Sequence, residues 1–313
     1  MIRAGGPISV ERYMELSNAH YYATRDPLGA AGDFTTAPEI SQMFGEIVGA
    51  ALADCWLQSG APGDAVYVEF GPGRGTLAAD ALRVMRKAGF GGEVHFVETS
   101  PVLRAEQAKW VPDAHWHGTL EDLPEAPLLL VANEFFDALP VRQWIGGEER
   151  RVTIAGDALM FSADGPIRED SPAREGAMRA IADRLAAHGG VALVLDYGHA
   201  RSGEGDTLQA VRGHGYADAL AEPGEQDLTA HVDFESLAKA SAEVGVTQVL
   251  GQGEWLERLG IAARAEALAE AHPERADEIA AALQRLTAPD RMGELFKVVA
   301  VHSPQWPAPA GFE

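Results

Sequence analysis

The chain has 313 residues, of which 46% are hydrophobic and 23% charged, with a formal net charge of −22. This composition is typical of a globular protein and excludes a disordered or fibrous chain, while the charge disfavours nucleic-acid binding. The single cysteine excludes a disulfide framework and a cysteine-rich zinc site and fits a reducing compartment. Without a long apolar run or a signal-peptide pattern, we expect a cytoplasmic protein that does not insert into membranes.

The first region, residues 1–62, is predicted to be mainly helical. A helical pattern begins at Val10, and residues 18–32 are predicted to form an irregular loop. Thr36 can cap the next helix, and Glu39 stands three residues later, as a capping box requires. We expect this region to be an N-terminal helical lid segment.

From residue 63 to residue 313 the pattern alternates between strands and helices. The predicted strands are 65–70, 93–97, 115–120, 128–132, 191–196, 247–250 and 296–302. The predicted helices are 76–88, 101–110, 178–188 and 233–244. Two insertions are expected, one at about 141–170 with a hairpin of 141–145 and 151–154, and an alanine-rich helical one at about 254–290. Such alternation predicts an α/β fold with a mainly parallel sheet, whose ligands bind beyond the carboxyl ends of the strands.

The first strand of this sheet ends in an acid and three glycines at alternate positions, Glu69, Gly71, Gly73 and Gly75. Glycine lets a ligand approach the main chain closely, and the helix that follows offers free N–H groups. Thr76 replaces the last glycine of a dinucleotide fingerprint, and Glu69 would repel a pyrophosphate. An ammonium group suits the acid, and S-adenosylmethionine carries an ammonium and a sulfonium without a phosphate. A purely structural turn is the alternative.

The next two strand ends carry further candidates for a nucleoside. Glu98, with Thr99 beside it, can accept hydrogen bonds from both ribose hydroxyls. Alternatively, Glu98 is a favourable charge at the start of the following helix. Leu120 closes the third strand, where it could line an adenine.

The fourth strand is followed by two carboxylates, Glu134 and Asp137, with Phe135 between them. They could be ordinary solvated loop charges. Two carboxylates beside an aromatic wall can instead hold a cation, and the planar fork of arginine fits such a pair.

Five segments resemble the MidA family of S-adenosylmethionine-dependent methyltransferases, which are similar to the mitochondrial complex I assembly factor that methylates an arginine. The segments are 32–41, 69–75, 133–140, 196–198 and 227–234. The resemblance implies a seven-strand, Rossmann-like class I methyltransferase sheet with a last antiparallel strand. It also implies Gly71, Gly73, Glu98 and Asn133 at the cofactor, and Glu134 and Asp137 near the acceptor. The segment 18–22 is shorter than is usual in the family.

The complete expectation is a methyltransferase that acts on an exposed arginine of a protein, such as a respiratory complex I subunit, by in-line displacement. The expected catalytic residues are Glu134, Asp137 and His231. The expected cofactor residues are Thr36, Glu69, Gly71, Gly73, Gly75, Glu98, Thr99, Leu120 and Asn133, and the expected substrate pocket comprises Phe34, Glu39, Phe135 and Tyr197. His115 and His117 lack a third ligand, so no metal site is expected. A homodimer, built on the alanine-rich insertion, is a further expectation.

Two alternatives stay open at this point. The chain could be an assembly chaperone that binds the cofactor without transferring methyl groups. It could also be a nicotinamide-dependent oxidoreductase, although Thr76 and Glu69 argue against that activity.

Overall fold

The computed structural model describes residues 2–24, 36–213 and 215–313. A central sheet of nine strands forms its core. Those strands are Val66–Phe70 (β2), Val94–Val97 (β3), His115–His117 (β4), Leu128–Asn133 (β5), Gly190–His199 (β11), Val232–Asp233 (β15), Gly245–Val246 (β16), Leu250–Gly251 (β17) and Phe296–His302 (β18).

The strand order of this sheet is β16-β18-β11-β5-β2-β3-β4, with β15 beside β11 and β17 beside β18. Strands β4, β3, β2, β5 and β11 run parallel to one another, whereas β18 pairs antiparallel with β11. The predicted α/β methyltransferase sheet with a last antiparallel strand is therefore confirmed. The strand expected at 247–250 is replaced by two short strands, β16 and β17, that flank it.

Helices cover both faces of the sheet. The helices of the described residues are Ile2–Gly5 (α1), Val10–Thr24 (α2), Ala37–Ile40 (α3), Gln42–Gln58 (α4), Thr76–Lys87 (α5), Pro101–Trp110 (α6), Pro172–His188 (α7), Phe234–Ala240 (α8), Gln252–Arg258 (α9), Ile261–Ala271 (α10) and Ala276–Thr287 (α11), with short helical turns at Leu120–Asp122, Pro273–Arg275 and Pro289–Gly293. Alternate residues of β5 point to opposite faces. Leu129 and Val131 pack with α4, α5 and the C-terminal helices, whereas Leu128 and Leu130 pack with α7 and α8. None of the described helices is long and apolar enough to cross a membrane.

The N-terminal region differs from its expected form in three ways. Helix α2 continues to Thr24, so residues 18–24 are helical and not part of a loop. Thr36 makes no side-chain cap, and Ser41 instead accepts a hydrogen bond from Met43 at the start of α4. Helix α4 packs in the same core as α5. The boundary at residue 62 stays a prediction, but α4 is part of the core and not of a lid.

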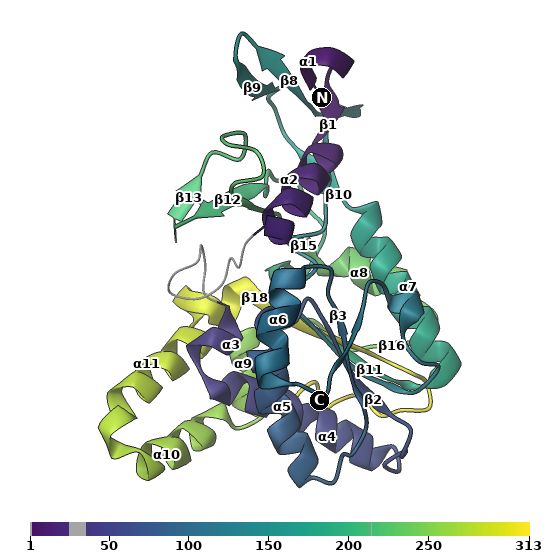
Figure 1. The fold of residues 1–313 in the computed structure, drawn as a ribbon, viewed down its shortest axis with the longest axis vertical. Helices are drawn as coiled ribbons and strands as arrows, with labels where there is room; N and C mark the ends of the chain where they lie inside the picture. The colour runs from purple at the N-terminus through teal and green to yellow at the C-terminus, as the bar shows by residue number, and fades with distance from the viewer. Residues whose placement is uncertain (1, 25–35, 214) are drawn as a thin grey trace.

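Three small sheets lie beyond the carboxyl edge of the central sheet, in the upper part of Figure 1. The first sheet consists of Ile8–Ser9 (β1), Arg151–Ala155 (β8) and Ala158–Phe161 (β9). The second consists of Arg168–Asp170 (β10), Arg142–Ile145 (β6) and Glu148–Glu149 (β7). The third consists of Gly215–Ala217 (β13), Gln209–Arg212 (β12) and Asp227–Thr229 (β14). Helix α2 shares a small apolar core with them.

The predicted hairpin of 141–145 and 151–154 is wrong. Gly146 and Gly147 both have positive φ and form a two-residue turn, so Ile145 pairs with Glu148 at once. The strand beginning at Arg151 then joins β1 in another sheet. The sheet of β12, β13 and β14 was not predicted.

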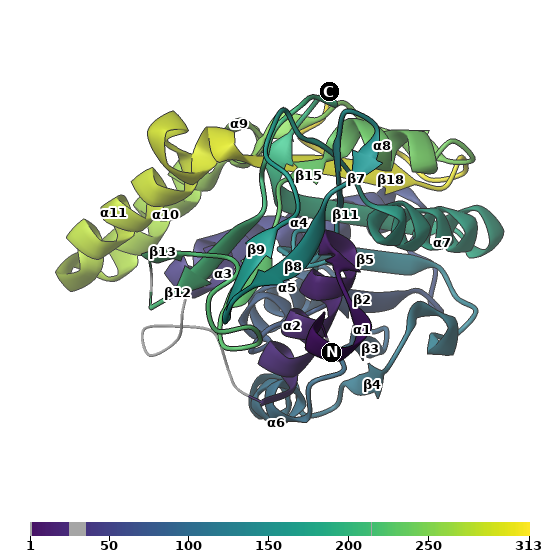
Figure 2. The same ribbon diagram turned by 90° about the horizontal axis from the view of Figure 1, so that it is seen from above.

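The C-terminal insertion is helical, as expected, and Figure 2 shows α10 and α11 extending away from the sheet. Glu46 of α4 anchors this pair because it accepts two hydrogen bonds from Arg264, at 2.7 and 3.0 Å, and one from Arg83 at 2.8 Å. The helix predicted at 233–244 is shorter than expected and ends at Ala240. Asp233 caps it, as its position predicted, by accepting a hydrogen bond from Ser236.

Candidate active site

The parallel strands bring their terminal residues together at one edge of the sheet. Phe70 of β2 pairs with Val97 of β3 on one side and with Ala132 of β5 on the other, and Leu195 of β11 pairs with Asn133 of β5. Polar residues follow at each of these points, which is where open α/β sheets bind their ligands.

The glycine loop after β2 has a backbone that side chains would obstruct. Gly71, Gly73 and Gly75 have φ values of 57°, 54° and 84°, in the left-handed region. A Cβ atom on Gly71 would lie 3.2 Å from the Phe135 ring, and one on Gly75 would lie 3.3 Å from the Cα of Gln107. Glycine is thus required both by the backbone conformation and by close packing.

Gln107 of α6, which was not predicted as a site residue, connects the glycine loop to Glu98. Its fully buried amide donates to the Gly73 carbonyl at 2.8 Å and to Glu98 Oε2 at 3.2 Å. Its oxygen accepts from Trp116 Nε1 at 2.8 Å. Gly73, Glu98 and Trp116 belong to different segments of the chain. Gln107 therefore fixes the glycine loop relative to Glu98, and both were predicted to bind the cofactor. Nothing in the sequence distinguishes Gln107 from an ordinary polar position of a helix.

Glu98 is nearly buried, and its Oε1 accepts a hydrogen bond from the backbone N–H of Ser100 at 2.7 Å. Burial raises the pKa of this carboxyl, and the hydrogen bonds from Ser100 and Gln107 oppose that rise. Thr99 lies in the turn between Glu98 and Ser100. Leu120 packs into the apolar core against the α7 face of the sheet.

Glu69 is buried within β2 and accepts a hydrogen bond from the Tyr67 hydroxyl at 2.7 Å. Burial raises the pKa of Glu69 to about 8. This carboxyl is therefore held inside the sheet behind the glycine loop.

The segment after β5 turns sharply at Glu134, whose φ of 50° is rare for a residue with a side chain. Its Oε1 accepts hydrogen bonds from the backbone N–H of Ala37 at 3.2 Å and from Asn133 Nδ2 at 3.3 Å. Burial and the nearby charge of Asp137 raise the pKa of Glu134 to about 8. The amide oxygen of Asn133 is buried and has no partner among the described residues, so it is an available acceptor.

Asp137 lies three residues after Glu134 and is buried, whereas Glu134 is half-buried. Burial raises its pKa, while a hydrogen bond with Tyr197 and the charge of Arg174 act in the opposite direction. Its Oδ1 has no hydrogen-bond partner among the described residues. The structure thus brings together Glu134, Asp137 and Tyr197, which the sequence had assigned to catalysis and the substrate pocket.

Two buried charged residues hold this segment in place. Asp196 accepts hydrogen bonds from the backbone N–H groups of Phe136 and Asp137 at 2.9 and 3.1 Å. Arg174 donates to the carbonyls of Asp137, Ala230 and His231 at 2.9, 2.9 and 2.7 Å. Neither Arg174 nor Asp196 was predicted as a site residue.

Aromatic rings form the wall of the site. Phe135 makes edge contacts with Phe70 and Phe136, at centroid distances of 5.3 and 5.4 Å. Glu39 of α3 lies beside the start of α5, the helix after the glycine loop, where it accepts a hydrogen bond from the Thr76 hydroxyl at 3.2 Å. The backbone carbonyl of Thr36 accepts from Glu39 N–H. Phe34 lies outside the described residues.

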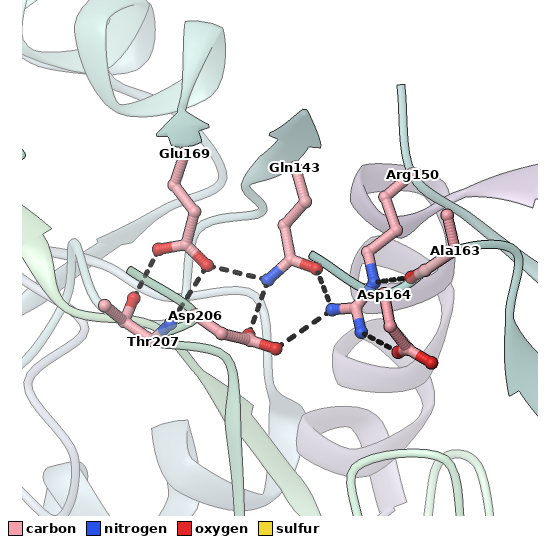
Figure 3. A network of polar contacts seen from close by, with 7 residues as sticks. All are labelled: Gln143, Arg150, Ala163, Asp164, Glu169, Asp206 and Thr207. Atoms are coloured by element: carbon pink, nitrogen blue, oxygen red, sulfur yellow. Dashed lines mark hydrogen bonds and ion pairs between the residues drawn. The ribbon is translucent and has the colours of Figure 1, made fainter. Parts of the chain in front are cut away.

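His231 contacts the edge of Tyr197, with ring centroids 5.5 Å apart, but it opens onto a separate cleft of about 830 Å³. Its backbone N–H donates to Thr207, which Figure 3 shows in contact with Glu169. The same figure shows Gln143 and Arg150 extending this network into the insertion. Tyr197 thus contacts both His231 and the carboxyl of Asp137, and His231 lines the cleft together with Arg174 and Thr207.

The chain is similar to known proteins over most of its length. A model of a family described as S-adenosyl-L-methionine-dependent methyltransferase matches residues 47–159 and 148–252. The protein arginine methyltransferase NDUFAF7 homolog of Drosophila melanogaster is 37% identical over 96% of this chain and 82% of its own length. Human NDUFAF7, also named a protein arginine methyltransferase, is 33% identical over 96% of this chain and 81% of its own length.

A crystal structure from Burkholderia thailandensis, bound to S-adenosyl-homocysteine, superposes with a TM-score of 0.85. It is 27% identical and covers 99% of this chain and 91% of that one.

The comparisons also correct one expectation. Both NDUFAF7 proteins are named mitochondrial, so the prediction of a cytoplasmic protein is wrong. A single cysteine indicates a reducing compartment and does not separate one such compartment from another. The family match, the curated relatives and the superposed structure all agree with the predicted resemblance, and the chain belongs to this family of S-adenosylmethionine-dependent methyltransferases.

Proposed function

We propose that this methyltransferase transfers a methyl group to an arginine side chain of a protein. The observation that carries the proposal is the pair of carboxyls Glu134, half-buried, and Asp137, buried, in the segment directly after β5, the strand beside β2 and its glycine loop. Buried Asp196 of β11 holds this segment by its backbone. A guanidinium is the side-chain cation whose fixed fork of donors matches such a pair of carboxyls. The names of the curated relatives support the same acceptor.

The residues at the sheet edge fit S-adenosylmethionine. The left-handed glycine loop permits close approach of a ligand. The amide oxygen of Asn133, which no described residue engages, can accept a hydrogen bond from an amine. We assign to the cofactor Thr36, Glu69, Gly71, Gly73, Gly75, Glu98, Thr99, Leu120 and Asn133. When bound, the cofactor supplies an electrophilic methyl group on a positively charged sulfur.

Glu134 and Asp137 are proposed to bind and orient the guanidinium. Asp137 Oδ1 has no hydrogen-bond partner among the described residues, and the Nη groups of Arg174 donate to backbone carbonyls and not to this oxygen. The pKa of Glu134, raised to about 8, means that this carboxyl holds a proton near neutral pH in the free site, and burial also raises the pKa of Asp137. Binding of a cation favours the charged carboxylates, so this proton leaves as the acceptor enters.

Alignment and exclusion of water are the remaining contributions of the protein. The edge-to-face rings of Phe70, Phe135 and Phe136 keep water from the carboxyls. Phe34, Glu39, Phe135 and Tyr197 are assigned to the substrate pocket. His231 stays a candidate whose contribution would pass through Tyr197.

The identity of the substrate is a finer part of the proposal. A respiratory complex I subunit is suggested by the resemblance to the assembly factor, and a homodimer through the helical insertion stays a prediction. Mass spectrometry of cells with and without this gene would name the substrate. Loss of one arginine methylation supports the proposal, whereas loss of methylation at another residue type contradicts it.

Calorimetric titration with S-adenosylmethionine tests the cofactor assignment. We expect Glu98→Ala to weaken binding by about tenfold or more, because it removes a buried acceptor. Glu93→Ala, at an exposed position just before β3, is the control and should bind as the wild type does. Normal binding together with no methyl transfer in any extract would instead favour an assembly chaperone.

A further inference from the structure

A cleft of about 830 Å³ lies between the start of α7, helix α8 and the loop of residues 200–208 that joins β11 to β12. Its volume is within the range of about 300–1,000 Å³ that is usual for ligand sites. Arg174 lines the cleft and also donates a hydrogen bond to the Asp137 carbonyl at 2.9 Å. His231, which lines it as well, contacts the Tyr197 ring. The cleft therefore adjoins the proposed acceptor site.

Hydrogen bonds from the insertion fix the loop of residues 200–208. Asp206 accepts from Gln143 Nε2 at 2.8 Å and from Arg150 Nη1 at 2.9 Å. The N–H of Thr207 donates to Glu169 at 3.1 Å. Figure 3 shows these five residues joined in one network. A wall that is already ordered loses little conformational freedom when a ligand binds, so the cleft is a preformed site.

Basic side chains converge on this cleft from four elements. They are Arg168 of β10, Arg179 of α7, Arg201 of the loop and Lys239 of α8, and all four are exposed. These four residues are named the cleft bases. The whole chain has 47 acidic and 25 basic residues, so the grouping runs against its average charge. The cleft bases favour a ligand with negative charge.

Acidic side chains line the cleft too, but the fold already engages most of them. Ser236 donates to Glu175 through its hydroxyl at 2.7 Å and to Asp233 through its N–H at 3.1 Å. Asp170 accepts from Arg142 Nε at 2.7 Å. The lining acids are Glu169, Asp170, Glu175, Glu204 and Asp233. All but Glu204 thus accept hydrogen bonds from neighbouring residues of the protein.

Two of the cleft bases form exposed ion pairs. Arg168 lies 3.4 Å from Asp170, and Lys239 lies 2.9 Å from Glu235. Exposed ion pairs contribute little to stability, because water and salt screen them. Carboxylates of a ligand can therefore exchange with these two partners at small cost.

Positive charges also act at the inner end of the cleft. Burial lowers the pKa of the His231 imidazole, and the charges of His199 and Arg174 lower it further. Charges that disfavour protonation of an imidazole favour a nearby anion for the same reason. An anionic ligand thus suits both the inner end of the cleft and its exposed edge.

We propose that the cleft binds an acidic segment of the protein substrate, adjacent in sequence to the arginine that is methylated. The proposal rests on the proposed arginine acceptor and names the class of substrate, a chain in which Asp or Glu residues flank that arginine. The arginine binds Glu134 and Asp137, while carboxylates farther along the substrate bind the cleft bases. An extended chain advances about 3.3 Å per residue, so acids three or four positions away lie roughly 10–13 Å from the arginine.

This arrangement places a negative site for the arginine beside a positive cleft for its neighbours. Such a pair of sites selects for one pattern of charge in the substrate and repels a basic segment. It therefore provides specificity among exposed arginines, which the acceptor carboxyls alone do not.

The test measures binding of four peptides to the full-length protein saturated with S-adenosyl-homocysteine. Two peptides have a central arginine, flanked on both sides by glutamates in one and by glutamines in the other. The other two have citrulline at the centre, which keeps the shape and removes the positive charge. The glutamate preference is the ratio of affinities of the glutamate and glutamine peptides with the same centre. We expect a preference of about tenfold or more in the wild type, because several exposed ion pairs add together.

The cleft variant combines Arg179→Gln with Arg201→Gln, and we expect its glutamate preference to fall by about threefold or more. The control combines Arg86→Gln of α5 with Arg285→Gln of α11, both exposed and outside the lining of the cleft. It changes the net charge equally and should keep the preference of the wild type. An unchanged preference in the cleft variant, or an equal fall in the control, would overturn the proposal.

The citrulline peptides separate this proposal from the proposed function. If arginine peptides bind more tightly than citrulline peptides but glutamates give no advantage, the arginine acceptor stands and the site for an acidic segment is refuted, even where inorganic phosphate binds the cleft. If the cleft variant loses the glutamate preference while arginine and citrulline peptides bind equally, the acidic-segment site stands and the arginine acceptor fails.

Discussion

Asp196 Oδ2 accepts a hydrogen bond from the backbone N–H of Asp137, 3.1 Å away, and so holds one predicted catalytic residue by its main chain. The same oxygen accepts from Phe136, and Oδ1 accepts from the N–H of Tyr197. One fully buried carboxyl thereby fixes both the acidic segment after β5 and the end of β11. The acceptor site depends on this residue although it need not touch the substrate.

The first prediction concerns Asp196→Asn. The amide would turn an N–H₂ group toward a backbone N–H, leaving buried donors unpaired, so we expect a loss of about 1–3 kcal/mol in the free energy of unfolding. Methyl transfer should fall more steeply than stability at a temperature where the variant is folded. Urea unfolding and a methyl-transfer assay measure the two effects, and unchanged activity would contradict the positioning role.

The second prediction concerns Gln107→Leu, which keeps much of the side-chain volume and removes its hydrogen bonds. Gly73, Glu98 and Trp116 would each lose a partner. We expect the affinity for S-adenosyl-homocysteine to fall by about tenfold or more, measured by calorimetry. Gln58→Leu, on the exposed end of α4, is the control. Equal affinities in the two variants would show that Gln107 does not organise the loop.

The third prediction concerns Gly71→Ala. The Cβ atom of the alanine would lie 3.2 Å from the Phe135 ring, and the residue would have to adopt a φ of 57°. We therefore expect the loop to shift. We expect a loss of about 1 kcal/mol in stability and a larger relative loss in cofactor binding. Gly63→Ala has open space around it and should affect neither property. Thermal unfolding with and without cofactor distinguishes these results.

The fourth prediction concerns the pH dependence of stability. Burial raises the pKa of Glu69 and of Glu134 from 4.5 to about 8. Between the ordinary pKa and the raised pKa, the folded chain binds more protons than the unfolded chain. The contribution of the two carboxyls to the free energy of unfolding is therefore complete below the ordinary pKa, and it decreases as the pH rises toward the raised pKa. Each group contributes a slope of at most about 1.4 kcal/mol per pH unit.

Urea unfolding from pH 5 to pH 8.5 measures this slope. Glu69→Gln should flatten the profile of the free energy of unfolding, because the amide has no proton to lose. Glu106→Gln, on the surface of α6, should leave the profile as it is in the wild type. A profile that rises over this range in the wild type would contradict the account.

Much of the site could be predicted because chemistry is concentrated where buried strands end. Apolar and aromatic residues otherwise fill the strand at 65–70, and the strand at 128–132 is apolar, so Glu69 near the end of the first and Glu134 just beyond the second stand out. Glycines at alternate positions then fix the loop between strand and helix. These signals are local in the sequence, and the central sheet that follows from them is confirmed.

Contacts between distant segments could not be predicted in the same way. Tyr22 and Asp227 meet only because α2 crosses β14, and the small sheet of β12, β13 and β14 has weak strand signals of its own. Gln107 and Arg174 looked like ordinary polar positions of helices until their partners were known. The failed hairpin has the same origin, since β8 pairs with β1 from the start of the chain.

The most direct test of the central claim is a methyl-transfer experiment with radiolabelled S-adenosylmethionine. The wild type and Glu134→Gln are each incubated with an extract from cells that lack this protein, and the labelled residue is identified by mass spectrometry. The account predicts label on an arginine with the wild type and at least about a hundredfold less with Glu134→Gln, since a buried charge to the acceptor is lost. Label on a different residue type, or equal labelling by both proteins, would contradict it.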